Sequence, residues 1–376
     1  MSCDLFVFAG EKSGDLHGEK LLQALYAKHP HLKIVGVGGP KMRSVGMQCV
    51  LPMEEFQVMG FIDVFFALPK LIRQFHFVVD KILQFKPKAV LMIDYPGFNL
   101  RMAKRLRKMN FKGKLIHFIC PSVWAWGKKR IPMMGKTLDL LLSILPFEKE
   151  LFEKTPLNVA YVGHPLIERL KQYRYQAFAS KEKVIALFPG SRTKEIQRNL
   201  PLYLAVCRIL LNKHPELQIA LSVSEERHRP LIAKLLAEKQ WQEKDILFVS
   251  AEQTYELMQR AHLAIAKSGT VTLELALHRV PTVVTYGVSL LDKIIAYDIL
   301  RIRLQFYCIV NIIAGKEVFA ELIGPNFTQD ALLEKAEALL DDSNRVQIDR
   351  NCTNLIDQLG IHETAPKAAT EILKLL

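Results

Sequence analysis

Residues 4–28 read DLFVFAGEKSGDLHGEKLLQALYAK, and this stretch decides the class of fold. After its first residue it runs apolar as far as Ala9, which is typical of a strand buried on both faces of a parallel sheet. Gly10 and Gly14 then bracket a tight turn, and apolar residues recur at helical spacing over Leu16–Lys28. A buried strand, a glycine turn and an amphipathic helix make the first part of a βαβ unit.

The same alternation continues along both halves of the chain. Further strands are predicted at Leu32–Val37, Ala89–Asp94, Leu115–Ile119, Leu138–Ile144, Lys183–Gly190, Leu217–Val223, Ile246–Ser250, Leu263–Ala266 and Val280–Tyr286. A helical pattern covers Leu100–Asn110, and closing helices are predicted at about Gln329–Asp342 and Glu363–Leu376. This alternation predicts an α/β protein with doubly wound parallel sheets.

A polar stretch interrupts the alternation after Gly163-His164-Pro165. It reads ERLKQYRYQAFASKEK over residues 168–183. We therefore predict two Rossmann-like domains, residues 1–170 and 171–376, that face a ligand cleft at the carboxyl ends of their strands. The last helix is expected either to stay with the second domain or to pack back on the first.

The composition limits the classes of function. The 376 residues carry 51 Lys and Arg against 38 Asp and Glu, a net charge of +13, which implies an anionic partner. Half of the residues are hydrophobic, which argues against disorder. The basic residues are spread over helices and loops without a recognisable nucleic-acid module, so a nucleic-acid partner is not expected.

The chain shows no sign of export or of a membrane span. Its six cysteines include no Cys-x-x-Cys pair, which favours a reducing compartment. The N-terminal MSCDLFVFAG lacks the basic region of a signal peptide. No uncharged apolar run reaches the ~18 residues of a transmembrane helix. These features predict a cytoplasmic protein.

Two carboxylates follow predicted strand ends in the first half. Glu11 either faces the cleft or is a solvated part of a helix-capping loop, in which Ser13 or Asp15 caps the helix. Asp94 lies in IDYPGFN (93–99), either as a structural partner of a helix N-terminus or as a general base at the cleft floor. The two tryptophans of PSVWAW (121–126) are interpreted as packing residues.

Two glycine turns in the second half predict an anion site. They are FPGSRTKEI (188–196), with Gly190, Ser191 and Arg192, and AKSGTVTLE (266–274), with Ser268, Gly269 and Thr270. Backbone N–H groups at two helix starts, together with an arginine, bind an anion such as a diphosphate. Glu274, one turn into the second helix, is placed to accept hydrogen bonds from a ribose diol. The two turns together predict a nucleoside-diphosphate site.

The histidine and carboxylate spacings predict neither a metal nor another cofactor. No Asp-x-Asp pair follows a strand at a cleft position, and the eleven histidines show no His-x-x-x-His or His-Glu-x-x-His spacing. Two α/β domains, a carboxylate in the first and a diphosphate site in the second, fit a metal-independent glycosyltransferase that uses a nucleotide sugar.

Six motifs resemble those of the lipid-A-disaccharide synthase family. They are GEKSGD (10–15), PSVWAW (121–126), LPFE (145–148), VGHP (162–165), PGSR (189–192) and SGT-x-x-LE (268–274). The resemblance implies the GT-B fold of two Rossmann-like domains and an inverting hexosyltransferase of lipid A (lipopolysaccharide) biosynthesis. The implied reaction joins UDP-2,3-diacylglucosamine to 2,3-diacylglucosamine 1-phosphate, without a metal, and gives the β-1,6 lipid A disaccharide 1-phosphate and UDP.

The resemblance also assigns residues, and the chain departs from the pattern at three positions. Glu11 and Asp94 match catalytic positions, and Arg192 and Asn311 match nucleotide-binding positions. The departures are Gly97 in place of an Asp, Ile309-Val310 in place of Leu-Pro, and Gly324 in place of a Gln. They affect the expected shape of the acceptor and nucleotide sites rather than the reaction class. The alternative is another UDP-sugar-dependent GT-B transferase or an epimerase, which needs the nucleotide loops but not the first-domain motifs.

Acylated substrates imply peripheral binding to the anionic cytoplasmic face of the inner membrane. The stretch MGFIDVFFALPKLIRQFHFVVDKILQF (59–85) is predicted to supply it, with an amphipathic helix after Pro69. The predicted contacts are Phe61, Phe65, Phe66, Leu68, Lys70 and Arg73. An ordinary core helix is comparably apolar, so that reading stays open. Lys293–Phe306 is either a second membrane contact or part of a homodimer interface.

Overall fold

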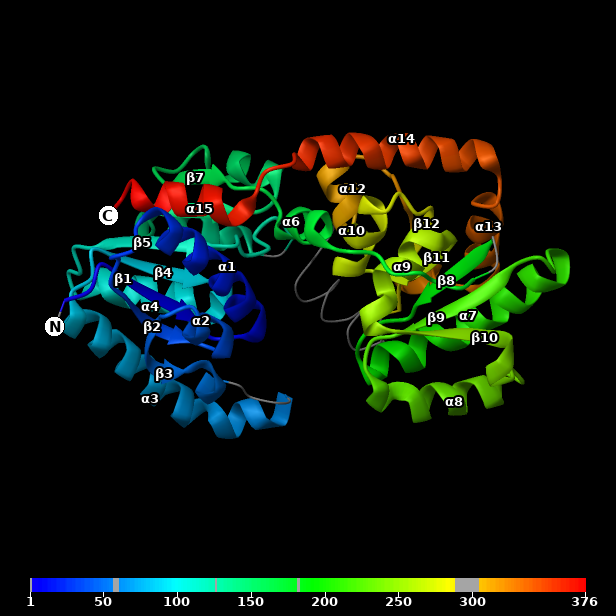
Figure 1. The fold of residues 1–376 in the computed structure, drawn as a ribbon, viewed down its shortest axis with the longest axis horizontal. Helices are drawn as coiled ribbons and strands as arrows, with labels where there is room; N and C mark the ends of the chain where they lie inside the picture. Colours follow the sequence, from blue (N-terminus) through cyan, green and yellow to red (C-terminus); the bar gives the residue numbers. More distant parts are fainter. Residues whose placement is uncertain (1, 57–60, 126, 181–182, 288–303) are drawn as a thin grey trace. The chain divides into compact units, whose positions relative to one another are not determined.

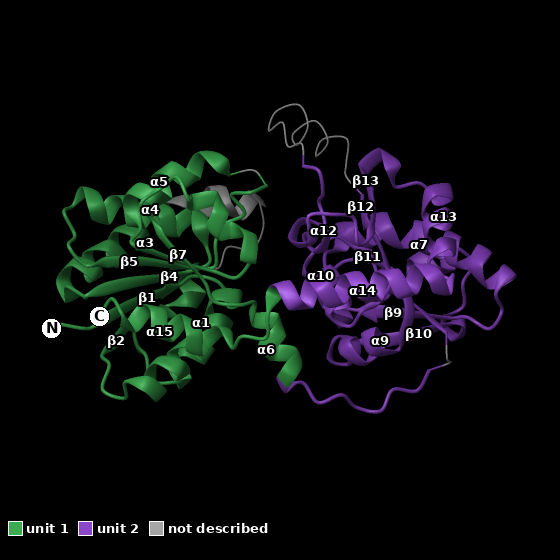
Figure 2. Ribbon diagram, turned by 90° about the horizontal axis from the view of Figure 1, so that it is seen from above, with its two compact units in different colours: residues 1–171, 359–376 green, residues 172–358 purple. Residues whose placement is uncertain are grey.

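The computed structural model describes residues 2–56, 61–125, 127–180, 183–287 and 304–376, with the backbone alone for 61–68. The chain divides into two compact units, which Figure 2 colours separately. Unit 1 comprises Met1–Lys171 and Leu359–Leu376, and unit 2 comprises Gln172–Gln358. The C-terminal helix therefore belongs to unit 1, which is one of the two placements that the sequence left open for the last helix.

Unit 1 is built on a seven-stranded parallel sheet (Figure 1). Its strands are β1 (Leu5–Ala9), β2 (Ile34–Gly38), β3 (Gln48–Pro52), β4 (Ala89–Ile93), β5 (Lys114–Phe118), β6 (Leu140–Ser143) and β7 (Asn158–Tyr161). Their order is β3-β2-β1-β4-β5-β6-β7. The order reverses between β1 and β4, which pair in register from Leu5↔Ala89 to Ala9↔Ile93. Ligands of doubly wound sheets bind at such a reversal.

Helices cover both faces of the first sheet, and successive side chains of a strand point to opposite faces and so join different cores. Phe6 and Phe8 belong to one core cluster, with residues of α3 and α4, and Leu5 and Val7 belong to the other, with residues of α1 and α15. The helices of unit 1 are α1 (Lys12–Lys28), α2 (Pro40–Ser44), α3 (Phe61–Phe85), α4 (Pro96–Lys108), α5 (Ile131–Thr137), α6 (Pro165–Gln172) and α15 (Thr364–Leu373). Figure 1 shows α15, in red, beside α1.

Unit 2 repeats the topology with six parallel strands. They are β8 (Val184–Phe188), β9 (Gln218–Val223), β10 (Ile246–Ser250), β11 (Ala261–Lys267), β12 (Thr282–Tyr286) and β13 (Ala320–Ile323), in the order β10-β9-β8-β11-β12-β13. Its helices are α7 (Thr193–Lys213), α8 (Arg229–Glu238), α9 (Thr254–Arg260), α10 (Thr270–Leu277), α12 (Ile309–Ala314), α13 (Gln329–Ala338) and α14 (Asp342–Leu359). The order reverses between β8 and β11.

The predicted strands all occur, but three strands and one long helix were not predicted. The three strands β3, β7 and β13 each lie at the edge of a sheet. Polar or partly exposed residues shorten the apolar run in these three strands, whereas the fourth edge strand, β10, keeps a continuous run and was predicted. The prediction also ended a helix at Asp342, where α14 instead begins, and started one after Pro69, which lies inside α3. Proline removes one helical hydrogen bond but keeps a helical φ, and α3 continues through it.

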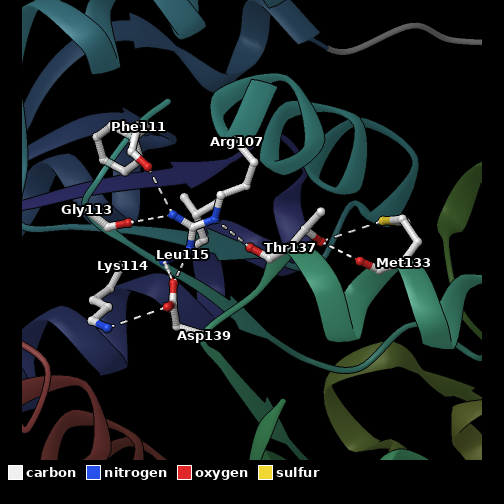
Figure 3. A network of polar contacts seen from close by, with 8 residues as sticks. All are labelled: Arg107, Phe111, Gly113, Lys114, Leu115, Met133, Thr137 and Asp139. Atoms are coloured by element: carbon white, nitrogen blue, oxygen red, sulfur yellow. Dashed lines mark hydrogen bonds and ion pairs between the residues drawn. The ribbon is translucent and has the colours of Figure 1, made fainter. Parts of the chain in front are cut away.

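Arg107 joins three segments at the amino ends of the central strands of unit 1 (Figure 3). Its guanidinium donates to the carbonyl oxygens of Phe111, Gly113 and Thr137 at 3.0–3.1 Å and pairs with Asp139. Asp139 in turn accepts from the Leu115 N–H at 2.7 Å. This network lies at the edge of the sheet opposite the strand ends that carry Glu11 and Asp94, so we assign it to stability.

Candidate active site

The reversal point of the first sheet brings Glu11 and Asp94 to neighbouring strand ends. Asp94 directly follows β4, and Glu11 lies two residues beyond β1 as the N-terminal cap residue of α1. Burial is the larger cause that raises the pKa of Glu11, and the negative charge of Asp94 raises it further. The two carboxylates therefore interact electrostatically, as expected of side chains that share a site.

Asp94 is held in an uncommon backbone conformation. Its φ is +51° and that of Tyr95 is +44°, a left-handed region that few non-glycine residues adopt. The buried Asn99 side chain stabilises this turn by donating to the Asp94 carbonyl at 2.6 Å and the Ile93 carbonyl at 3.3 Å. The Ser13 hydroxyl donates to Asp94 Oδ2 at 3.0 Å. The carboxylate is thus oriented by the protein itself, as a positioned base must be.

The predicted cap of α1 is wrong. Asp15 is buried, and its carboxylate accepts from the N–H groups of Gly39, Lys41 and Met42 at 2.8–3.1 Å, so it caps the following helix α2. Ser13 contacts Asp94 instead. Asp15 lies on the buried side of α1, so its side chain contacts the start of α2 rather than the N-terminus of its own helix.

Two histidines near Asp94 have pKa values below that of an ordinary histidine. Burial lowers the pKa of His117, on β5, to about 4, although the charge of Asp94 opposes this shift. Burial also lowers the pKa of His17, again with Asp94 opposing it. The sequence analysis did not single out either residue, because neither lies in a metal-binding spacing.

The reversal point of the second sheet joins the two glycine turns. Phe188 at the end of β8 pairs with Ala266 of β11, so the turns leave from the same edge. Together they line a cavity of about 380 Å³. Its lining includes six predicted residues, Gly190, Ser191, Arg192, Gly269, Thr270 and Glu274. Ser268 is adjacent in sequence but not in the lining, and its N–H donates to the Thr285 carbonyl at 2.8 Å.

Glu274 is positioned by a contact within the protein. The Tyr255 hydroxyl donates to Glu274 Oε1 at 3.0 Å. Glu274 lies on α10 and Tyr255 on α9, so the contact links two helices of unit 2. A carboxylate oriented in this way can accept from a sugar diol, and that role stays a prediction.

Among the lining residues that sequence reasoning missed, two are charged, Glu195 and Lys267. Glu195 accepts from the Ser191 N–H at 3.1 Å and pairs with Lys267 at 3.1 Å and Arg192 at 3.2 Å. Burial alone would raise the pKa of Glu195, but Lys267, the Ser191 N–H and Arg192 together lower it. The pairing crosses from one turn to the other, so no local spacing reveals it.

Asn311 does not join the residues that line the cavity. It is buried, and its amide nitrogen donates to the Phe319 carbonyl and to Glu321, both at 2.7 Å. Its amide oxygen accepts from the N–H groups of Val318 and Phe319 at 2.8 and 2.9 Å. These four bonds use the ordinary capacity of an amide, so the geometry favours a role in holding residues 318–321.

One of the departures has a local explanation and one has none. A Cβ added to Gly97, in the first turn of α4, would have no other atom within 4 Å, so nothing in the structure requires glycine there. Gly324 has a φ of +58°, which favours glycine over the expected glutamine. Val310 is buried in α12.

The predicted membrane stretch is only partly described. The side chains of Phe61, Phe65, Phe66 and Leu68 lie outside the described residues, as does most of Lys293–Phe306. Lys70 and Arg73 are exposed, and Lys70 pairs with Glu55 at 2.7 Å.

The described part of α3 has both buried and exposed apolar side chains. Val78, Val79 and Ile82 are buried in the core, whereas Ile72 and Phe77 are 49% and 39% exposed. An apolar cavity of about 420 Å³ lies between α3 and α4, with Phe75 and Phe98 in its lining.

Among residues 2–56, 61–125, 127–180, 183–287 and 304–376, no three or more His, Cys, Asp or Glu side chains are arranged to hold a metal ion. Within the same ranges, no helix has both the length and the apolar character needed to cross a bilayer.

Two Rossmann-like units, each with a candidate site where the strand order of its sheet reverses, define the GT-B fold. The predicted fold class is confirmed by solved structures. A putative UDP-N-acetylglucosamine 2-epimerase from Listeria monocytogenes superposes with a TM-score of 0.63 at 13% identity, over 99% of this chain and 95% of that one. Glycosyltransferases also share the fold.

The chain belongs to the lipid-A-disaccharide synthetase family, whose profile matches residues 5–374. It is 36% identical to the lipid-A-disaccharide synthase of Chlamydia felis over 378 residues, 98% of this chain and 60% of that protein. It is 33% identical to the Gluconobacter oxydans synthase over 384 residues, 99% of this chain and 90% of that protein. The chain thus spans about three-fifths of the chlamydial relative.

Proposed function

We propose that this chain is an inverting hexosyltransferase of lipid A biosynthesis. It transfers 2,3-diacylglucosamine from its UDP derivative to 2,3-diacylglucosamine 1-phosphate, and it releases UDP and the β-1,6-linked disaccharide 1-phosphate. The observation that carries the proposal is the cavity of unit 2, where both glycine turns of the family motifs meet. Unit 1 takes the acylated acceptor, and unit 2 takes the UDP-sugar.

Asp94 is the proposed general base. Its carboxylate accepts the proton of the acceptor 6-hydroxyl, and the hydroxyl oxygen attacks the anomeric carbon from the side opposite UDP. The bond from that carbon to the diphosphate oxygen breaks, and its electron pair leaves with UDP, which inverts the configuration. Ser13 and Asn99 support the assignment because they fix the carboxylate and the turn that carries it. Glu11 is proposed to act beside Asp94 in the same site.

The leaving diphosphate needs positive charge and hydrogen-bond donors in unit 2. Arg192 and the backbone N–H groups at the starts of α7 and α10 are proposed to supply them, because negative charge is stabilised at helix N-termini. Glu274 is proposed to bind the ribose. These groups account for departure of UDP without calling on a cofactor.

We propose that the reaction takes place at the cytoplasmic face of the inner membrane, since both proposed substrates are acylated, and that α3 contacts the anionic leaflet there. Ile72→Asp is expected to reduce co-sedimentation with anionic vesicles, since it puts a charge on an exposed apolar position of α3. Val346→Asp is the matched control, because Val346 is 60% exposed on α14 of unit 2. Equal sedimentation of the two variants would move the membrane contact away from this part of α3.

The direct test is product analysis. The protein is incubated with both acylated glucosamine substrates, and mass spectrometry is used to detect the disaccharide 1-phosphate and UDP. Conversion of the UDP-sugar to an epimer without the acceptor would instead identify an epimerase, and transfer to a different acceptor would identify another UDP-sugar-dependent GT-B transferase. Family membership does not favour that alternative, because the first-domain motifs are present as well as the nucleotide loops. Absence of the disaccharide would refute the proposal.

A further inference from the structure

The anion-binding donors of unit 2 are already occupied by a carboxylate of the chain itself. Glu195 Oε2 accepts from the Ser191 N–H at 3.1 Å, and Glu195 Oε1 lies 3.1 Å from Lys267 Nζ and 3.2 Å from an Arg192 nitrogen. One backbone N–H at a helix start and two cations are the kind of donors that hold a phosphate group. The cavity therefore presents a phosphate-like site whose present occupant is a side chain.

The backbone of the glycine turn makes room for this occupant. A Cβ added to Gly190 would lie 2.6 Å from Glu195 Oε2, and Gly190 has a φ of +121°. A residue with a side chain at position 190 would be strained and would also push the Glu195 carboxylate away. Glycine at this position thus allows the carboxylate to lie directly on the turn.

The two cations differ in how they are held. The side chains of Lys267 and Glu195 are each 18% exposed, whereas the Arg192 side chain is 80% exposed. Lys267 also lies over the Tyr286 ring, 5.1 Å from its centroid. Lys267 is therefore the cation that is fixed in the cavity lining, and Arg192 is the one that extends into solvent.

We propose that Glu195 is an internal substitute for the ligand's diphosphate, and that Lys267 exchanges the Glu195 carboxylate for the diphosphate when the nucleotide binds. The inference rests on the proposed function, since it concerns the same cavity. Before the nucleotide binds, the carboxylate keeps a largely buried lysine paired, which avoids the cost of an isolated charge. A diphosphate must displace this carboxylate, so the exchange weakens binding. When Glu195 returns to its donors, it favours release of UDP.

Binding of UDP, inorganic pyrophosphate and uridine is measured by calorimetry for wild type and two variants. Glu195→Gln removes the competing charge and is expected to tighten UDP and pyrophosphate roughly tenfold, since hydrogen bonds to a charged group are worth about that much. Lys267→Met keeps the aliphatic stem and is expected to weaken both ligands by roughly tenfold or more. Uridine, which lacks phosphate, should bind alike to all three proteins.

Glu337→Gln is the matched control. Glu337 pairs with Lys213, which ends α7, whereas Glu195 lies in the first turn of that helix, about 30 Å away along its axis. Glu337→Gln therefore removes one negative charge from unit 2, as Glu195→Gln does, but far from the cavity. Thermal unfolding verifies that each variant folds. If Glu195→Gln does not fold, the binding of pyrophosphate by Lys267→Met decides the test.

The outcomes separate this inference from the proposed function. Unchanged or weaker pyrophosphate binding by Glu195→Gln would show that Glu195 only supports the turn, and it would overturn the inference even if the enzyme makes the disaccharide. Unchanged binding by Lys267→Met would overturn it equally. Tighter pyrophosphate binding in a protein that makes no disaccharide would uphold the exchange and refute the proposed reaction.

Discussion

Asp94→Asn removes the proposed base while leaving its surroundings in place. Asparagine has nearly the shape of aspartate, and its amide oxygen can still accept from the Ser13 hydroxyl. Loss of a general base typically costs about 10²–10⁴ in rate. We therefore expect kcat to fall by that factor, while UDP binding, which is proposed for unit 2, stays unchanged.

Ser13→Ala provides the scale for this effect. It leaves the Asp94 carboxylate and removes one hydrogen bond to a charged group, which is worth about 1.5 kcal/mol, or roughly tenfold, when it is exposed. The two variants should thus differ by at least a factor of about ten in kcat. Initial rates at saturating substrates, followed by mass spectrometry of the disaccharide, measure both.

The result that refutes the reasoning is specific. If Asp94→Asn keeps kcat within about threefold of wild type, Asp94 is not the base, and its turn serves structure alone. Glu11→Gln then becomes the decisive variant, because Glu11 is the other carboxylate at the same strand ends. A large loss in both variants would instead indicate that the pair acts together.

Three further predictions concern charge and stability. Arg192→Ala should lower kcat severely, and wild-type activity should survive EDTA; a strict requirement for added Mg²⁺ would contradict the proposed handling of charge. Burial raises the pKa of Glu148 to about 8, so its contribution to the free energy of unfolding is present below the ordinary pKa of 4.5 and is lost as the pH rises to about 8. Urea unfolding at pH 5 and pH 8.5 should show this loss in wild type but not in Glu148→Gln, and equal pH dependence would contradict it. Arg107→Ala should lower the free energy of unfolding of unit 1 by about 2–4 kcal/mol, since several hydrogen bonds to a half-buried guanidinium are lost. Arg105 is exposed on the same helix, and Arg105→Ala should change the free energy of unfolding by under about 0.5 kcal/mol. Similar values for the two variants would refute the role of the Arg107 network.

The sequence predicted those parts of the fold whose signal is local. Each buried central strand is a continuous apolar run, and each glycine turn follows one directly, so the sequence alone places Gly190 and Gly269 at strand ends. The strands β3 and β13 were not predicted because they are short of fully buried residues and their apolar runs are interrupted. Their burial depends on neighbours that are distant in the sequence.

The parts of the site that depend on contacts between segments could not be predicted. The spacing around Asp15 suggested a cap for its own helix, but its carboxylate caps α2, twenty-four residues away at Gly39. Lys267 and Glu195 meet across two turns. Asn311 matches a family motif, yet its amide oxygen accepts hydrogen bonds from the backbone N–H groups of Val318 and Phe319.

The return of the chain to unit 1 has a consequence for synthesis on the ribosome. Unit 2 is an insertion between residue 171 and residue 359, and the helix α15 that packs against α1 is translated after it. Residues 172–358 are therefore complete while one face of the first sheet still lacks Ala368, Ala369 and Ile372 from its core. Unit 2 therefore has its whole sequence before unit 1 does, and unit 1 keeps an apolar surface uncovered until α15 is translated, which exposes it to aggregation during synthesis.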